Sequence, residues 1–123
     1  MTTAPTALRR PVLSERAWQD QVLELAELYG WAPRYHTWSS QHSPAGFPDL
    51  VLCHATRRRV IFVELKTDVG RVSLEQRTWL LTLAACGMQV GLWRPRDLPE
   101  VLAVLGPPNA PICLHLPAEA IGR

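Results

Sequence analysis

The chain has 123 residues and a formal net charge of +2, with 47% hydrophobic and 20% charged residues. This length suits one domain, and this composition excludes an intrinsically disordered chain. The sequence has no apolar run of the about 20 residues that a membrane span needs, and its three cysteines lack the spacing of a disulfide framework or zinc ribbon. We therefore predict a cytoplasmic protein with one globular domain and no membrane association.

The first predicted element is a helix over 14–29, which follows a loosely attached arm at residues 1–12. Ser14 is a good N-cap, apolar residues then recur at helical spacing, and Gly30 is a stop signal. The same spacing places Glu15 on the buried stripe of the helix. An acid is unusual there, so Glu15 is a candidate functional residue.

Three strand-like segments come next, at 34–38, 48–53 and 57–66. The short connector between the last two predicts a hairpin. Residues 60–63 are apolar on both faces, as in the centre of a sheet that is covered on both sides.

A second helix, capped by Ser73, is predicted to end at Gly87. The remaining predicted elements are a strand over 88–95, a short helix from Asp97 to Val104, and an edge strand over 112–116 within a proline-rich extension at 107–123. The order helix, three strands, helix, strand, helix predicts an α/β fold. We expect one small mixed β-sheet flanked by helices, in a domain spanning 13–106.

Three polar residues at the predicted hairpin carry the candidate chemistry. Glu64 and Lys66 project from one face at the end of an apolar strand, and Asp49 can meet Glu64 across the hairpin. Two carboxylates at one point would suit Mg²⁺ or Mn²⁺, and Lys66 beside them can orient or deprotonate a water. Taken alone, the Glu-x-Lys pair is more typical of an exposed salt bridge and the Pro-Asp pair of a strand entry. Their combination with the apolar run and Glu15 favours a site.

Several segments together resemble a known family. They are Ser14-Glu15, GFPDLVL at 46–52, VELKTDVGRVSLEQRTWL at 63–80, and Gly87, Val90 and WRP at 93–95. The PD…ELK pattern is that of the PD-(D/E)XK phosphodiesterases, and the details resemble the VRR-NUC branch of virus-type replication and repair nucleases. The resemblance covers residues 14 to about 98 and implies a restriction-endonuclease-like core of order αβββαβ.

The resemblance implies a role for each motif residue. The expected catalytic residues are Asp49, Glu64, Lys66, Glu15 and Gln76. Asp49, Glu64 and the main-chain carbonyl of Leu65 would hold Mg²⁺, for which Mn²⁺ should substitute, and Lys66 would serve the attacking water. Glu15 would bind a second ion or hold the water shell of the first.

Two of these residues have an alternative role that the sequence leaves open. Gln76 stands three residues after Ser73, so it can complete a capping box instead of facing the site. Glu15 can be a favourable first-turn charge against the helix dipole.

Arginines are the expected DNA contacts, because they give salt-sensitive and sequence-independent affinity. The candidates are Arg57, Arg58 and Arg59 at the hairpin tip, and Arg71, Arg94 and Arg96 near the site. A solvated charged turn is the alternative for each of them. His36 and His42 are weaker site candidates, and Trp38, Trp79 and Trp93 are core residues by default that can also form a dimer face.

These observations predict a Mg²⁺-dependent, structure-selective DNA endonuclease. We expect a homodimer that resembles Holliday-junction resolvases or cuts other branched DNA, in phage or bacterial replication, recombination or repair. The alternatives are a defence, restriction-type or packaging-associated nuclease, and a non-catalytic DNA-binding module. An intact PD…ExK set disfavours the last of these.

Overall fold

The computed structural model describes residues 12–37 and 44–107. Nearly all of the arm predicted at 1–12 and of the extension predicted at 107–123 lies outside the described residues. So do His42, Trp38 and the edge strand predicted at 112–116.

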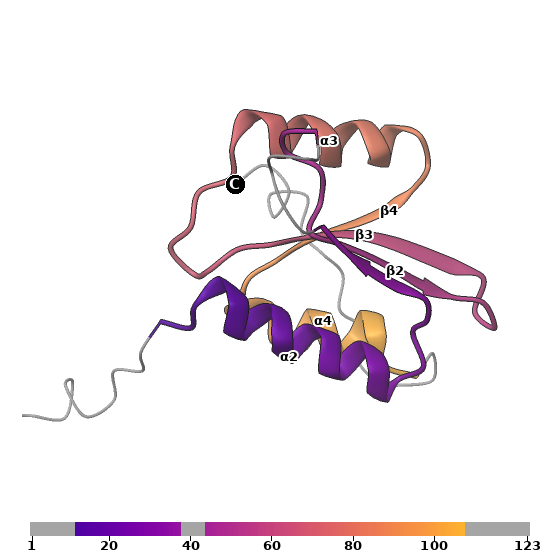
Figure 1. The fold of residues 1–123 in the computed structure, drawn as a ribbon. Coiled ribbons are helices and arrows are strands. Elements are labelled where there is room, and N and C mark those ends of the chain that lie inside the picture. Colours follow the sequence, from indigo (N-terminus) through magenta and orange to yellow (C-terminus); the bar gives the residue numbers. More distant parts are fainter. Residues whose placement is uncertain (1–11, 38–43, 108–123) are drawn as a thin grey trace, which may run out of the picture.

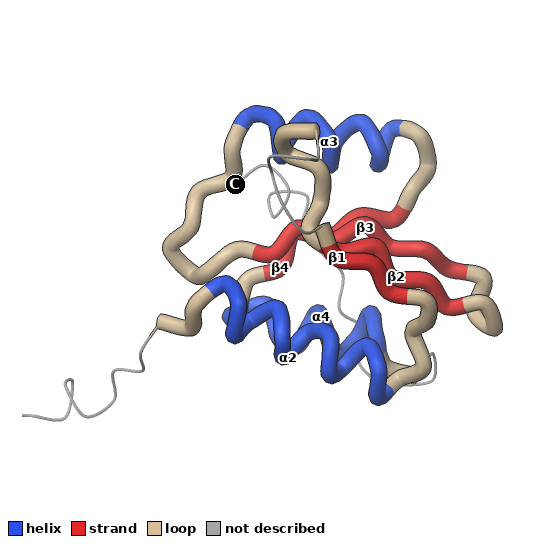
Figure 2. Tube along the Cα trace, in the orientation of Figure 1, coloured by secondary structure: helices blue, strands red, loops and turns tan. Residues whose placement is uncertain are grey.

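Four strands form one mixed sheet between two layers of helices (Figures 1 and 2). The strands are β1 (Arg34–His36), β2 (Leu50–His54), β3 (Arg59–Leu65) and β4 (Gln89–Trp93), in that spatial order; the helices are α2 (Glu15–Leu28), α3 (Leu74–Ala85) and α4 (Leu98–Leu105). The β1–β2 and β2–β3 pairs are antiparallel and the β3–β4 pair is parallel. The predicted α/β class and element order are confirmed. Within the described ranges, no helix has the length and hydrophobicity that a membrane span requires.

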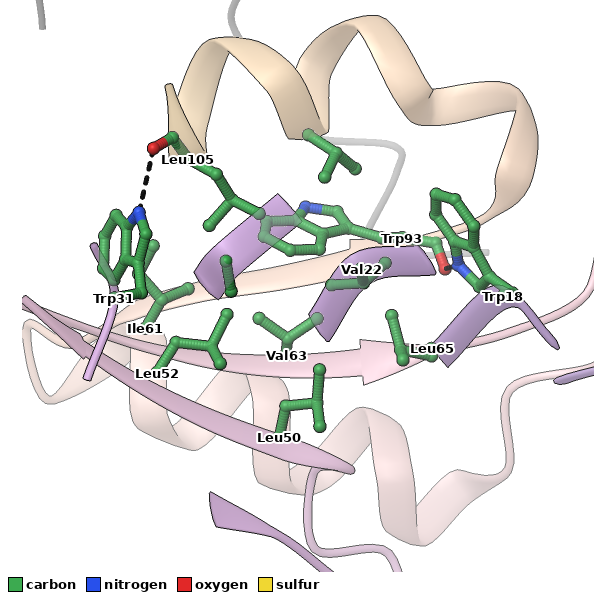
Figure 3. Close-up of a cluster of buried hydrophobic side chains, with 12 residues drawn as sticks. Trp18, Val22, Trp31, Leu50, Leu52, Ile61, Val63, Leu65, Trp93 and Leu105 are labelled. Carbon is green, nitrogen blue, oxygen red and sulfur yellow. Dashed lines mark hydrogen bonds between the residues drawn. The ribbon is translucent and has the colours of Figure 1, made fainter. Parts of the chain in front are cut away.

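The core follows the alternation of side chains along β3. Ile61, Val63 and Leu65 are fully buried against α2 and α4, whereas Phe62 faces the second cluster beneath α3. Figure 3 shows the larger cluster, which lies between the sheet and the two helices. The sheet is thus covered on both faces, as the apolar run at 60–63 predicts.

Two buried indoles fasten the helical layer to other elements (Figure 3). The Nε1–H of Trp18 on α2 donates to the Trp93 carbonyl at 3.0 Å, and that of Trp31 donates to the Leu105 carbonyl at 2.9 Å. A buried indole N–H that lacked an acceptor would be costly. The first bond therefore ties α2 to the end of β4, and the second ties the segment after α2 to the end of α4.

Local capping sets the helix starts. The Ser14 hydroxyl accepts from the Ala17 N–H at 3.1 Å, and Ser73 forms the predicted capping box with Gln76. Asp97 occupies the predicted N-cap position of α4, but its carboxylate makes no cap bond. It accepts instead from the Arg94 N–H at 2.9 Å, because the 3₁₀ turn at Pro95–Asp97 folds it back on that amide.

Candidate active site

Three carboxylates from separate elements converge at one end of the sheet. Asp49 lies just before β2, one position beyond the Leu50–Val63 pair, and therefore stands opposite Glu64 on β3. Glu15 begins α2. One oxygen from each of Glu15, Asp49 and Glu64 lies within 4.8 Å of the others. The hairpin predicts that Asp49 meets Glu64, and the family resemblance implies that Glu15 lies near them; this convergence is present. The expected burial of Glu15 is wrong: it is exposed, because it occupies the first turn of α2.

Burial and mutual repulsion make these carboxylates reluctant to ionise. Burial above all, and then repulsion from Asp49, raise the pKa of Glu64 to about 9, although the Lys66 ammonium opposes the shift. Burial also raises the pKa of Asp49, against the opposing effect of the Leu65 N–H, which donates to Asp49 Oδ2 at 2.8 Å. Partial desolvation by the neighbouring groups, and then the Asp49 charge, raise the pKa of Glu15 although its side chain is exposed.

The carboxylate cluster has the chemistry of a divalent-cation site. Glu64 is 1% exposed, and neither of its carboxylate oxygens has a hydrogen-bond partner in the described part of the chain. Burying carboxylate oxygens without hydrogen bonds is costly even beside the Lys66 ammonium, and a bound cation would offset that cost. Oxygen donors of this kind suit Mg²⁺, Mn²⁺ or Ca²⁺ and not softer metals.

Lys66 lies next to the carboxylate cluster. Its Nζ lies 3.7 Å from Glu64 Oε2, and its side chain is 15% exposed. A compact ammonium so close to a carboxylate site can bind a phosphate oxygen or exchange a proton with water.

Aromatic packing holds the loop that leads into Asp49. The Phe47 ring meets Trp79 of α3 edge-to-face at 5.1 Å between centroids, and it meets Phe62 of β3 at 6.4 Å. Thr37 adds two bonds: its N–H donates to the Asp49 carbonyl at 2.8 Å, and its hydroxyl donates to the Pro48 carbonyl at 2.9 Å. Phe47 belongs to the GFPDLVL segment at 46–52, but no local feature of the sequence predicts this anchoring.

Gly46 in the same loop is expected to tolerate no side chain. Its φ is +86°, and an added Cβ would lie 2.5 Å from the Glu75 backbone carbon at the start of α3. We expect Gly46→Ala to lower the free energy of unfolding by about 3 kcal/mol or more, from left-handed strain plus overpacking. Urea unfolding measures this loss.

Gly87 is the matched control for this substitution. It has nearly the same φ, +85°, but an added Cβ would meet nothing within 4 Å. Gly87→Ala should therefore cost about 1 kcal/mol, which is the backbone strain alone. Equal losses at the two positions would contradict the clash at Gly46.

Gln76 and His36 differ in how the structure relates them to the site. The Gln76 side-chain oxygen accepts from the Ser73 N–H at 2.9 Å, so its capping role is present and its catalytic role stays a prediction. His36 lines an open cavity of about 430 Å³ together with Glu15, and it is close enough to Asp49 to favour the charged carboxylate. The Leu65 carbonyl likewise stays a predicted ligand.

The six candidate DNA-binding arginines do not form one surface. Arg57 donates to the carbonyls of Leu105 and Gly106 at 3.0 and 2.6 Å, and Arg59 donates to Gln89 Oε1 at 2.8 Å. These two are half-buried, while the neighbouring Arg58 is exposed. Their hairpin lies at the opposite end of the β2–β3 ladder from the carboxylates, five residue pairs and about 15 Å away.

The arginines after β3 and β4 also differ in position. Arg71 and Arg96 are exposed, but Arg94 is only 5% exposed. Arg94 thus differs from the surface position that we expected, because its guanidinium Nη1 donates to the Thr67 and Gly70 carbonyls, both at 2.7 Å.

Comparison with known proteins gives three similarities. A VRR-NUC domain model matches residues 8–97, which include the three carboxylates and Lys66. A stretch of 49 residues is 41% identical to the Fanconi-associated nuclease 1 homolog of Caenorhabditis elegans; it is 40% of this chain and 6% of that protein. A solved structure of a VRR-NUC domain protein has a TM-score of 0.51 at 18% identity, covering 78% of this chain and 93% of that one. This last similarity is one of fold.

Proposed function

The chain belongs to the VRR-NUC family of PD-(D/E)XK nucleases, and from this premise we propose that it is a divalent-metal-dependent DNA endonuclease. The observation that carries the proposal is the convergence of Glu15, Asp49 and Glu64 beside Lys66. A structural salt bridge would need only Glu64 and Lys66.

Each residue of the cluster has a proposed task. Asp49 and Glu64 would hold Mg²⁺, and Glu15 would hold a second ion or the water shell. The Leu65 carbonyl would be a further ligand. The cation, when bound, would lower the pKa of the attacking water and offset the charge that develops on the phosphate. Lys66 would orient that water or, as the neutral amine, accept its proton, and Gln76 would act from the start of α3. We infer from the family resemblance that the products carry 5′-phosphate and 3′-hydroxyl ends.

We further propose that the substrate is branched DNA and that the protein acts as a homodimer, in phage or bacterial DNA metabolism within the cytoplasm. The exposed arginines Arg58, Arg71 and Arg96 are the proposed phosphate contacts. Arg57 and Arg59 remain secondary candidates, because the structure already engages their guanidinium groups. A domain of one small sheet has a short DNA footprint by itself, which a second copy would lengthen.

The test is cleavage of labelled four-way junction, flap, duplex and single-stranded DNA, with Mg²⁺ or with EDTA. We expect Mg²⁺-dependent cuts placed symmetrically in the junction, and light scattering at about twice the chain mass. Cutting of the other substrates alone would keep the nuclease chemistry and reject the junction role.

Absence of cleavage by the folded protein with either Mg²⁺ or Mn²⁺ would reject the nuclease proposal. Retained DNA binding under those conditions would then favour the non-catalytic module. A monomer in light scattering would contradict paired strand cutting without touching the chemistry of the site.

A further inference from the structure

The segment after Lys66 is bonded along its length to the turn after β4. The Lys66 N–H donates to the Trp93 carbonyl at 3.0 Å, which extends the β3–β4 pairing one residue beyond β3. The Arg96 N–H donates to Asp68 Oδ1 at 3.1 Å. Residues 66–70 thus lie outside regular secondary structure, but hydrogen bonds to the segment after β4 support them.

Arg94 makes two further hydrogen bonds to the 66–70 segment. Its guanidinium Nη1 donates to the Thr67 and Gly70 carbonyls, both at 2.7 Å, and these two residues are also joined by a Gly70 N–H to Thr67 carbonyl bond of 3.2 Å. The Thr67–Gly70 turn is therefore held by its own backbone hydrogen bond and by two hydrogen bonds from the buried guanidinium. A charged planar donor makes shorter and stronger hydrogen bonds than a neutral one.

The Thr67–Gly70 turn also lies close to the Lys66 side chain. A Cβ at Gly70 would lie 3.5 Å from Lys66 Cδ and 3.1 Å from Thr67 Oγ1, so a space of about one methyl group separates Gly70 from the lysine stem. Outward movement of this turn would widen the space beside the Lys66 side chain and let that side chain move more.

We propose that Arg94 is a positioning residue, which holds the Thr67–Gly70 turn and through it keeps the Lys66 ammonium beside Glu64. The inference rests on the proposed function, because it gives Arg94 a role in the step that Lys66 serves. A displacement of about 1 Å in a reacting group can cost up to about 10²-fold in rate. Arg94 would thus affect cleavage without touching the substrate.

Lys66 is the only lysine of the chain, which makes a direct test practical. Labelling lysine with ¹³C gives one Cε signal in the NMR spectrum, whose position and order parameter report on the Lys66 side chain. In Arg94→Gln we expect this signal to move and its order parameter to fall. We also expect kcat for DNA cleavage to fall about 10-fold or more, with KM changed less than about 2-fold.

Arg34→Gln is the matched control. Arg34 on β1 also donates from Nη1 to a backbone carbonyl, that of Trp31 at 2.6 Å, but it lies on the other edge strand of the sheet. The control should leave the Lys66 signal and kcat unchanged. An equal change in both variants would overturn the proposal, since general loosening would then explain it.

The outcomes separate this inference from the proposed function. An unchanged Lys66 signal in folded Arg94→Gln overturns the positioning role, whether or not the wild type cuts DNA. A changed signal in a protein that cuts no DNA supports the hold on Lys66 and overturns the nuclease proposal. If Arg94→Gln does not fold, Asp97→Asn is the second variant, because it weakens the hydrogen bond that Asp97 accepts from the Arg94 N–H. A smaller change of the Lys66 signal in this variant supports the proposal, and no change overturns it.

Discussion

Lys66→Ala is expected to lower the rate of DNA cleavage by at least ~10²-fold while the protein stays folded. The substitution removes the ammonium that lies 3.7 Å from Glu64, and the site then lacks its partner for water and phosphate. Lys66 is half-buried at the end of β3 and is not part of either apolar cluster, so the core is untouched. Single-turnover cleavage with Mg²⁺, beside circular dichroism, measures both effects.

Cation binding distinguishes this loss from damage to the carboxylates. A positive charge next to Glu64 repels a divalent cation, so Lys66→Ala should bind Mn²⁺ at least as tightly as the wild type in calorimetry. Lys66→Arg is the matched variant: it keeps the charge but not the compact amine, and it should restore little cleavage. Wild-type cleavage by Lys66→Ala would contradict the role that we give this residue.

The features that the sequence predicts well are those set by neighbours along the chain. Ser14 and Ser73 were identifiable as N-caps because a cap depends on the next three residues. The meeting of Asp49 and Glu64 was predictable because a short hairpin fixes the register of its two strands.

The contacts that the sequence did not predict join distant residues. Arg57 bonds to carbonyls 48 and 49 residues away, and Arg94 bonds to carbonyls 27 and 24 residues away. An arginine near a motif gives no local sign of whether it faces DNA or another backbone segment. Only the tertiary packing of α4 and of the 66–70 segment settles where these side chains lie.

Glu15 shows both sides of this limit. Its helix and first-turn position follow from local signals, but the burial that we expected from the helical stripe is wrong because the first turn of α2 is exposed. Its proximity to Asp49 and Glu64 depends on where α2 crosses the sheet, which helical periodicity cannot give. The expectation of that proximity came from the family resemblance.

Glu64→Gln is expected to change activity and stability in opposite directions. Cleavage should fall at least ~10²-fold and Mn²⁺ affinity should fall with it, because the most buried carboxylate of the cluster becomes a neutral amide. Without a cation, however, the variant should be more stable than the wild type near pH 8. With a pKa of about 9, Glu64 in the folded protein must hold a proton near pH 8 that the unfolded chain has released, and the neutral amide avoids that cost.

The pH dependence follows from the raised pKa of Glu64, which is about 9 in the folded protein against an ordinary 4.5. Between these values the folded state holds a proton that the unfolded state has released, so stability falls as pH rises. The wild-type contribution is complete below about pH 4.5 and is lost by about pH 9. In Glu64→Gln the slope should shrink to what Asp49 and Glu15 supply, since desolvation raises their pKa values too.

Thermal unfolding in EDTA from pH 5 to pH 9 measures this slope, with Glu24→Gln on the exposed face of α2 as the matched control. The control should follow the wild-type curve. Mn²⁺ should then stabilise the wild type increasingly as pH rises, because the cation binds deprotonated carboxylates, and it should stabilise Glu64→Gln little. Parallel curves for the wild type and Glu64→Gln in EDTA would mean that Glu64 is already ionised at neutral pH. The raised pKa would then be wrong, and with it the argument that a cation relieves the cost of burying this carboxylate.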